Sequence, residues 1–251
     1  MAAAYDTYDY PSYWIGREYE NQCDISAIRA FVEKIPQIGT AVELGTGFGR
    51  LVPSFLYRCK KVILSDPSAR LLKIARKNLK DKRIKFIHVG IDNITNKITK
   101  KSADLVILVR VIHHLENIDV VLNASKEMLK DNGYLILEFA NKCHIKARMT
   151  QFLKGNFTFS IDISPYDIRS SRSKKQNTLP FINYHPDFIE KKLKDFEFSL
   201  IEKRSVSNIR SPFAKKFFSL NTLVSLEKFL QKPLAKINFG PSIFILARKI
   251  G

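Results

Sequence analysis

The chain has 251 residues, 45% of them hydrophobic, and 42 Lys and Arg against 24 Asp and Glu give it a formal net charge of +18. A chain of this length can bury one sizeable core, so we expect a single domain, 1–251. No apolar run approaches the ~18 residues of a membrane span, and the first ten residues lack a secretory leader, so we expect a cytoplasmic protein. The three cysteines lie far apart, which excludes a disulfide framework.

Hydrophobic periodicity predicts helices that alternate with buried strands over the first 140 residues. The predicted helices cover 21–36, 48–59, 68–79 and 118–129, and the predicted strands cover 40–45, 61–65, 84–88, 104–109 and 134–139. Such alternation predicts a parallel sheet with helices on both faces, with ligands at the carboxyl ends of the strands. The first strand runs through a glycine turn directly into its helix.

The rest of the chain divides into a polar insertion and a regular C-terminal part. Residues 141–184 are rich in Lys, Arg, Ser and Asn and are interpreted either as a lid that recognises substrate or as a surface loop. The C-terminal part, 185–251, predicts helices at 185–196 and 211–231 and strands at 197–205 and 242–247. Residues 1–36 then form an aromatic arm and a helix, and 37–140 form the core. The helix at 211–231 carries apolar residues along one side: Phe213, Phe217, Leu220, Val224 and Phe229.

The most informative motif is the glycine turn after the first strand, which contains Glu43, Gly45, Thr46, Gly47 and Gly49. Glycines there let the backbone turn tightly and approach a ligand where a Cβ would collide, and a following helix start offers free N–H groups. A nicotinamide dinucleotide is disfavoured, since Arg50 replaces the third glycine of its fingerprint.

An acidic residue followed by this glycine pattern resembles the first motif of the class I S-adenosylmethionine-dependent methyltransferases. The resemblance implies an α/β fold with a doubly wound, mostly parallel, seven-stranded Rossmann-like sheet. It implies S-adenosylmethionine as cofactor and S-adenosylhomocysteine as product. We expect no metal, because no cluster of Asp, Glu and His has an evident ligand pattern. The glycine turn and its flanking residues would then bind the cofactor.

Asp66 and Pro67 end the second strand, where the family places a carboxylate that accepts both ribose hydroxyls. The alternative for Asp66 is capping of the next helix together with Ser68. Beyond the third strand, Ile91 stands where the family has an acid and Asp92 comes one residue later. Either Asp92 reaches the adenine amine, or the amide of Ile91 reads the adenine alone.

The fourth strand ends at Val109, which we count among the cofactor residues, and His113 and His114 follow. Paired histidines at this place resemble the small-molecule members of the family. Imidazole titrates near neutral pH, so either can serve as general base, with His114 the first choice. A structural role in the turn is the alternative.

The N-terminal aromatic segment is similar to leaders that fold over the cofactor in this family. Arg17 could pair with the methionine carboxylate, and the ring of Tyr13 suits a sulfonium cation. Packing of the arm on the sheet is the alternative.

We expect methyl transfer by in-line displacement to a small-molecule or lipid-linked acceptor. RNA is the second candidate, since the net charge suits phosphates although no recognition motif is present, and a non-catalytic cofactor-binding protein is the third. Contact with the anionic inner face of the membrane is also considered, through the helix at 211–231 and its basic flanks. Those flanks are Lys215, Lys216, Lys228 and Lys232.

Overall fold

A seven-stranded sheet of order β3-β2-β1-β4-β5-β9-β8 forms the centre of the computed structural model. The structure describes residues 6, 9–175 and 178–251, so parts of the expected arm and insertion lie outside the described residues. Strands β1 to β5 are parallel, and β9 runs antiparallel between β5 and β8. The strands cover β1 Ile38–Leu44, β2 Cys59–Asp66, β3 Ile84–His88, β4 Ala103–Leu108, β5 Leu129–Ala140, β8 Phe198–Val206 and β9 Ser242–Lys249.

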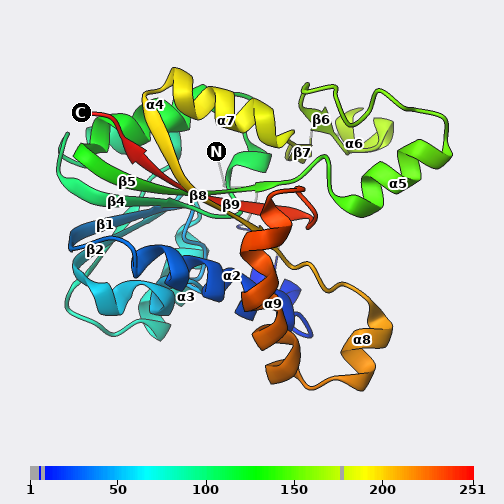
Figure 1. Cartoon of the computed structure of the whole chain (residues 1–251). Helices are drawn as coiled ribbons and strands as arrows, with labels where there is room; N and C mark the ends of the chain where they lie inside the picture. The colour runs from blue at the N-terminus through cyan, green and yellow to red at the C-terminus, as the bar shows by residue number, and fades with distance from the viewer. Residues whose placement is uncertain (1–5, 7–8, 176–177) are drawn as a thin grey trace.

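Helices cover both faces of this sheet, as Figure 1 shows. One face carries α2 (Glu18–Val32), α3 (Ala69–Asn78) and α9 (Leu220–Ala235), and the other carries α4 (Asp119–Met128) and α7 (Pro186–Asp195). The sheet and its two helical layers confirm the doubly wound α/β fold predicted from the alternation of elements. The carboxyl ends of the parallel strands therefore meet at one edge, where a ligand site is expected.

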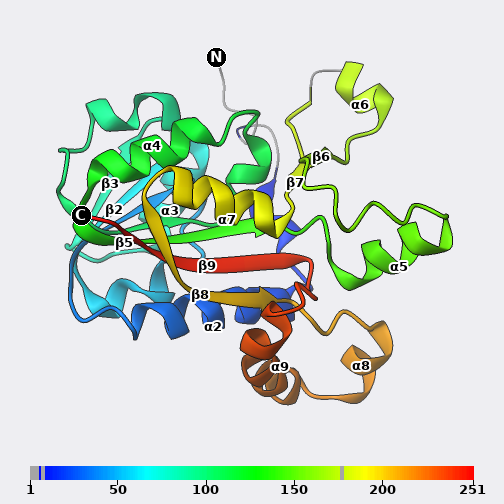
Figure 2. The ribbon, with the colours of Figure 1, turned by 45° about the horizontal axis from the view of Figure 1, so that its top comes forward.

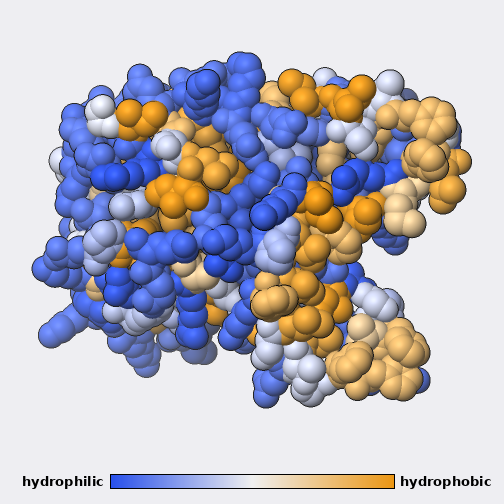
Figure 3. Space-filling view, viewed as in Figure 1, coloured by the Kyte–Doolittle hydropathy of each residue, from blue (hydrophilic) through white to orange (hydrophobic). Residues whose placement is uncertain are grey.

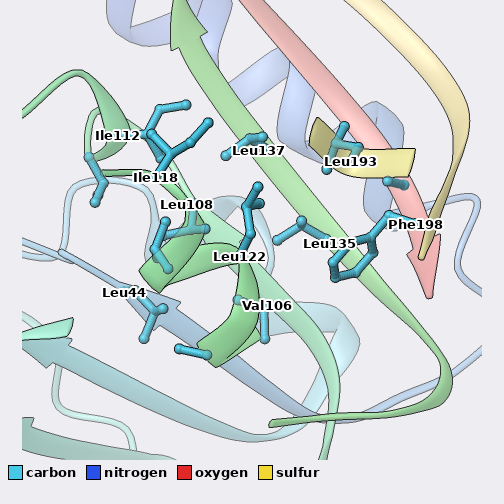
Figure 4. Close-up of a cluster of buried hydrophobic side chains, with 14 of the residues drawn as sticks. Leu44, Val106, Leu108, Ile112, Ile118, Leu122, Leu135, Leu137, Leu193 and Phe198 are labelled. Atoms are coloured by element: carbon cyan, nitrogen blue, oxygen red, sulfur yellow. The ribbon is translucent and has the colours of Figure 1, made fainter. Parts of the chain in front are cut away.

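The core between the sheet and its α4–α7 layer consists of aliphatic side chains (Figure 4). Leu108 and Leu137 point from the strands toward Leu122 of α4, and Leu193 of α7 lies nearby. Each fully buried side chain of this kind contributes about 1.5–3 kcal/mol relative to exposure. This layer fixes the relative positions of β4 and β5, whose ends carry residues of the candidate site.

The segment after the glycine turn departs from its predicted helix at 48–59. It forms two short 3₁₀ turns, Val52–Ser54 and Leu56–Arg58. Pro53 explains the difference, since proline lacks the amide hydrogen of an α-helix and its ring collides with the preceding turn. The apolar spacing remained informative about burial, because Leu51, Val52 and Phe55 are all buried.

The insertion after β5 contains short elements joined by loops. These are α5 (Ile145–Leu153), β6 (Tyr166–Asp167), α6 (Ser171–Lys175) and β7 (Ile182–Asn183), and β6 pairs with β7. Figures 1 and 2 show α5 and α6 projecting beyond the sheet on one side of the molecule. The insertion is thus built on the site edge of the sheet.

The prediction of one helix at 211–231 is wrong. The chain forms α8 (Pro212–Phe217) and then α9, because the Ser219 hydroxyl accepts the Thr222 amide and caps a new helix start. The buried side of α9 is also different from the predicted side: Leu223, Val224, Glu227, Gln231 and Ala235. The sequence misled because two inward positions are polar, and Glu227 accepts a hydrogen bond from the Tyr19 hydroxyl at 2.7 Å. None of the helices in the described ranges is long and apolar enough to cross a membrane.

Candidate active site

Backbone amides tie the glycine turn to the end of β2. The amides of Gly45 and Thr46 donate to the Ser65 carbonyl at 2.8 and 3.0 Å, and the Gly47 amide donates to Oδ2 of Asp66 at 2.7 Å. The sequence predicts free N–H groups at a helix start here. The turn instead uses these three amides internally, so it meets a ligand mainly through its shape.

Gly45 and Gly47 adopt left-handed backbone angles, with φ of +69° and +57°. A Cβ on Gly45 would lie 2.5 Å from Cγ2 of Val111, and one on Gly47 would lie 3.4 Å from the Tyr10 ring. Any other residue at either position would be strained and would crowd the space above the turn. The bare backbone therefore keeps that space open.

Glu43 supports the turn from inside the fold. Its Oε2 accepts the Thr46 hydroxyl at 2.5 Å, and burial raises the pKa of Glu43 to about 7. Gly49 packs closely on Leu79, and Val109 is buried. Four of the predicted site residues thus lie below or beside the edge of the sheet where a ligand is expected: Glu43, Thr46, Gly49 and Val109.

Asp66 is a buried carboxylate at the end of β2. Its Oδ1 accepts the Ser68 amide at 2.8 Å, while the Ser68 hydroxyl accepts the Leu71 amide at the start of α3. Burial raises the pKa of Asp66, and the bonds from the Ser68 and Gly47 amides oppose that shift. Asp66 therefore organises the capped turn and also faces the cavity beside it.

A first cavity of about 290 Å³ lies beside the glycine turn. It is close to the lower end of the range of about 300–1,000 Å³ usual for small-molecule pockets. Its walls are Tyr10, Gly45, Gly47, Ser65, Asp66, Pro67, Leu71, Val89, Gly90, Ile91, Asp92, Arg110, Val111, His114, Leu115 and Leu179. Seven of the predicted site residues meet here: Gly45, Gly47, Asp66, Pro67, Ile91, Asp92 and His114.

The N-terminal segment covers the glycine turn through α1 (Tyr10–Tyr13). Tyr10 lines the first cavity and stands edge-on to Phe48, with ring centroids 5.9 Å apart. Tyr13 and Arg17, which the sequence predicts at the cofactor, line a different cavity. There the Arg17 guanidinium carbon lies 4.2 Å from the Tyr13 ring centroid.

This second cavity encloses about 310 Å³ and has polar walls. They include Tyr13, Trp14, Arg17, Glu20, Arg110, His113, Glu138, Asn141, His144, Ile168, Phe181, Asn183, Ser207, Arg210 and Ser242. Several wall residues have a buried polar atom without a hydrogen-bond partner among the described residues: Glu20 Oε2, Arg110 Nε, His113 Nδ1, Asn183 Oδ1 and Ser207 Oγ. An unpaired buried polar atom costs about 1–3 kcal/mol.

Arg110 lines both cavities and was missed as a site residue. Its φ is +63°, and its amide donates to Oε2 of Glu138 at 2.8 Å. Its guanidinium lies 3.3 Å from both Asp24 oxygens. Burial opposes the charge of Arg110, but Asp24 and Glu138 outweigh it and raise the Arg110 pKa. The sequence signal that could have identified Arg110 as a site residue is the presence of an arginine within the apolar run 105–112.

The paired histidines, at the 3₁₀ turn Ile112–His114, face different cavities. His114 lines the first cavity, and its Nδ1 lies 2.8 Å from the Pro180 carbonyl, so Nδ1 carries the proton and Nε2 the lone pair. His113 lines the second cavity, and burial lowers its pKa well below the usual value. His185, at the start of the predicted helix 185–196, is a third histidine that could serve as base; it caps α7, and its Nε2 contacts the Ser160 carbonyl at 3.1 Å.

Comparison with known proteins assigns the domain. Residues 42–137 match the model of a methyltransferase domain family. That segment contains the glycine turn, Asp66 and the paired histidines. These residues therefore form a methyltransferase domain. The match supports S-adenosylmethionine as the cofactor, which the resemblance implied.

Solved structures share the fold of the methyltransferase chain at low sequence identity. A Thermotoga maritima methyltransferase is 15% identical with a TM-score of 0.62, and 98% of each chain is covered. A Haloferax volcanii methyltransferase in complex with an activator protein is 12% identical with a TM-score of 0.63, covering 98% of this chain and 100% of the other. The 1,6-didemethyltoxoflavin-N1-methyltransferase of Burkholderia thailandensis, with S-adenosylhomocysteine bound, is 12% identical with a TM-score of 0.59, covering 94% of this chain and 81% of the other. A search of curated proteins finds no match.

In the described part of the chain, no cluster of three or more His, Cys, Asp or Glu could hold a metal.

Proposed function

We propose that the methyltransferase binds its cofactor in the first cavity and methylates a small polar acceptor, free or lipid-linked, held in the second cavity. The observation that carries the proposal is the position of Arg110, which lines both cavities. The two cavities thus meet at one side chain, next to the end of β4. A methyl donor on one side and an acceptor on the other can then be aligned for in-line displacement.

The walls of the first cavity fit an adenosine. The two oxygens of Asp66 each accept one amide, which leaves each a further lone pair for a ribose hydroxyl. Ile91 and Asp92 begin a 3₁₀ turn at the far wall, where an adenine edge could meet them. Gly45 and Gly47 leave space where a side chain would stand.

The second cavity has the chemistry of a site for a polar acceptor that can carry an acidic group. Arg17 and Arg210 line it, and neither guanidinium has a carboxylate partner among the described residues. The carboxylate of Glu20 is paired with Lys215, and that of Glu138 accepts bonds from the Arg110 amide and the Ser242 hydroxyl. The two acids are thus partly neutralised, whereas Arg17 and Arg210 remain able to bind an acidic group of the acceptor.

We assign the base role to His113 rather than to His114. The cofactor supplies an electrophilic methyl group, and the protein needs to orient the acceptor and take its proton if one is lost. His113 lines the second cavity, its Nδ1 has no hydrogen-bond partner in the described part of the chain, and its lowered pKa keeps the imidazole neutral at physiological pH. His114 lies on the cofactor side and is oriented by the Pro180 carbonyl.

The experiment is incubation of the protein with radiolabelled S-adenosylmethionine and cell extract, followed by separation into small metabolites, lipids, RNA and protein. The proposal predicts label in the metabolite or lipid fraction. Asn183→Leu should fill the second cavity and abolish the labelling while S-adenosylhomocysteine binding is retained. Asn123→Leu, at an exposed position of α4, is the matched control.

Three outcomes would overturn the acceptor assignment. Label in the RNA fraction, with RNA affinity that falls steeply as salt rises, would establish an RNA methyltransferase. Cofactor binding with no labelled fraction in any extract would favour a non-catalytic binding protein. Equal labelling by Asn183→Leu and Asn123→Leu would place the acceptor outside the second cavity.

A further inference from the structure

Two segments project beyond the sheet on the same side of the molecule, and each exposes several large apolar side chains. One segment, residues 144–161, contains α5, and the other, residues 208–226, contains α8 and the start of α9. Both projections are visible in Figures 1 and 2. We call these two segments the α5 tip and the α8 tip.

The apolar residues of the two tips face solvent rather than the core. Leu153 is 82% exposed, Ile161 is 75% exposed and Phe213 is 69% exposed. Figure 3 shows hydrophobic side chains gathered on both projections, with a hollow between them. The exposed large side chains are Met149, Phe152, Leu153, Phe157 and Ile161 on the α5 tip, and Phe213, Phe217, Phe218, Leu220 and Leu226 on the α8 tip. A patch of this kind on a soluble domain indicates an interaction surface.

The charge of the tips identifies the kind of partner. Neither segment contains Asp or Glu, and both contain basic residues: Lys146, Arg148 and Lys154 on one, and Arg210, Lys215 and Lys216 on the other. Lys215 is paired with Glu20, but Lys146, Lys154 and Lys216 are exposed and have no carboxylate partner within the described ranges. Aromatic and aliphatic side chains beside lysines match a bilayer interface with anionic headgroups.

The aliphatic residues distinguish a membrane from a nucleic acid. Single-stranded RNA binds to basic surfaces through stacking of bases on aromatic rings, which would suit Phe152 or Phe213. Leu153, Ile161 and Leu220 offer no stacking face, yet they are exposed beside those rings. Such side chains gain free energy by entering the acyl boundary of a bilayer.

Both tips begin at the second cavity. His144, which caps α5, and Arg210, two residues before α8, line that cavity. A surface on which both tips rest would therefore lie close to the cavity. We propose that the α5 and α8 tips dock this protein on an anionic lipid bilayer. That the acceptor then comes from the bilayer rests on the proposed function, whereas the docking itself does not.

Vesicle flotation with the full chain tests the docking. We expect co-flotation with vesicles of phosphatidylglycerol and phosphatidylcholine, and little with phosphatidylcholine alone. The double variants Phe152→Ser/Leu153→Ser and Phe213→Ser/Phe217→Ser should each weaken binding about tenfold or more. Val120→Ser, an exposed apolar residue of α4 at 43% exposure, is the control and should bind like the wild type.

Other results would overturn the docking proposal. These are absence of flotation with anionic vesicles, equal binding by the tip variants and Val120→Ser, a dimer in sedimentation that the tip variants dissociate, or RNA binding lost in the tip variants with vesicle binding intact. Calorimetry with S-adenosylhomocysteine, done on the same proteins, separates the two proposals. Failure of docking with cofactor binding retained leaves the proposed function in place.

Discussion

The Gly47 amide donates to Oδ2 of Asp66 at 2.7 Å, so one side chain joins the glycine turn to the end of β2. Both elements line the first cavity. Any ligand that uses the Asp66 carboxylate therefore also meets the backbone of the turn.

Replacing Asp66 with Asn should weaken S-adenosylhomocysteine binding about tenfold to a hundredfold, because hydrogen bonds to a charged acceptor are worth about 1.5–3 kcal/mol. Isothermal titration calorimetry measures the change. Asp195→Asn, on the exposed side of α7, should bind like the wild type. Unchanged affinity in Asp66→Asn, or binding of NAD by the wild type, would contradict this assignment.

Gly47→Val should reduce the free energy of cofactor binding more than it reduces the free energy of unfolding. Its Cβ would stand 3.4 Å from the Tyr10 ring at the first cavity, and its φ of +57° disfavours a β-branched residue. Gly155→Val is the control, because Gly155 also has a positive φ but no atom lies within 4 Å of its Cβ position. Calorimetry and thermal unfolding of both variants separate the two effects. Equal loss of affinity in both would show that strain, not crowding of the cavity, is responsible.

Asp24→Asn should destabilise the fold by about 3 kcal/mol, since removing one partner of a buried ion pair leaves the other charge unpaired. Asp24 is fully buried and accepts Arg50 at 2.9 Å and Arg110 at 3.3 Å. Urea unfolding gives the free energy directly. Asp187→Asn, whose side chain is 68% exposed, should change it little. A comparable effect in the two variants would mean that the buried pairs add nothing.

Glu43 should make stability depend on pH in the direction opposite to an ordinary ion-paired acid. Burial raises its folded-state pKa to about 7 from a usual value of 4.5, so between these values the folded state binds more protons than the unfolded state. The stability that wild type gains from protonated Glu43 is therefore lost as pH rises through this window. Urea unfolding at about pH 5 and about pH 8 should show wild type losing stability relative to Glu43→Gln. If the difference in free energy of unfolding between wild type and Glu43→Gln is the same at both pH values, the pKa of Glu43 is not raised.

The sheet could be predicted from the sequence because buried parallel strands are nearly continuous apolar runs, as at 104–109. The positions of Asp66 and the glycine turn followed from the same runs, since strand ends define the ligand edge. Prediction failed where one residue overrode a periodic pattern. Pro53 replaced an α-helix by 3₁₀ turns, and Ser219 started a new helix within the predicted 211–231 helix.

The second cavity could not be predicted because its walls come from segments far apart in the chain. Arg17 precedes α2, Glu138 lies in β5 and Arg210 follows β8. Tertiary packing alone brings them together. The separation of the two histidines was equally hidden, since adjacent residues in a 3₁₀ turn point to different sides.

Strand β9 enters the sheet between β5 and β8, with Leu135 opposite Ala247 and Ser199 opposite Arg248. During synthesis β8 leaves the ribosome first, and in the described residues its sheet partner is β9. In a chain that still lacks β9, strand β8 is not joined to the sheet and one edge of β5 stays unpaired. Both can then pair with a strand of another molecule. Assembly of this half of the domain must therefore wait for β9, and long-range closure of this kind slows folding.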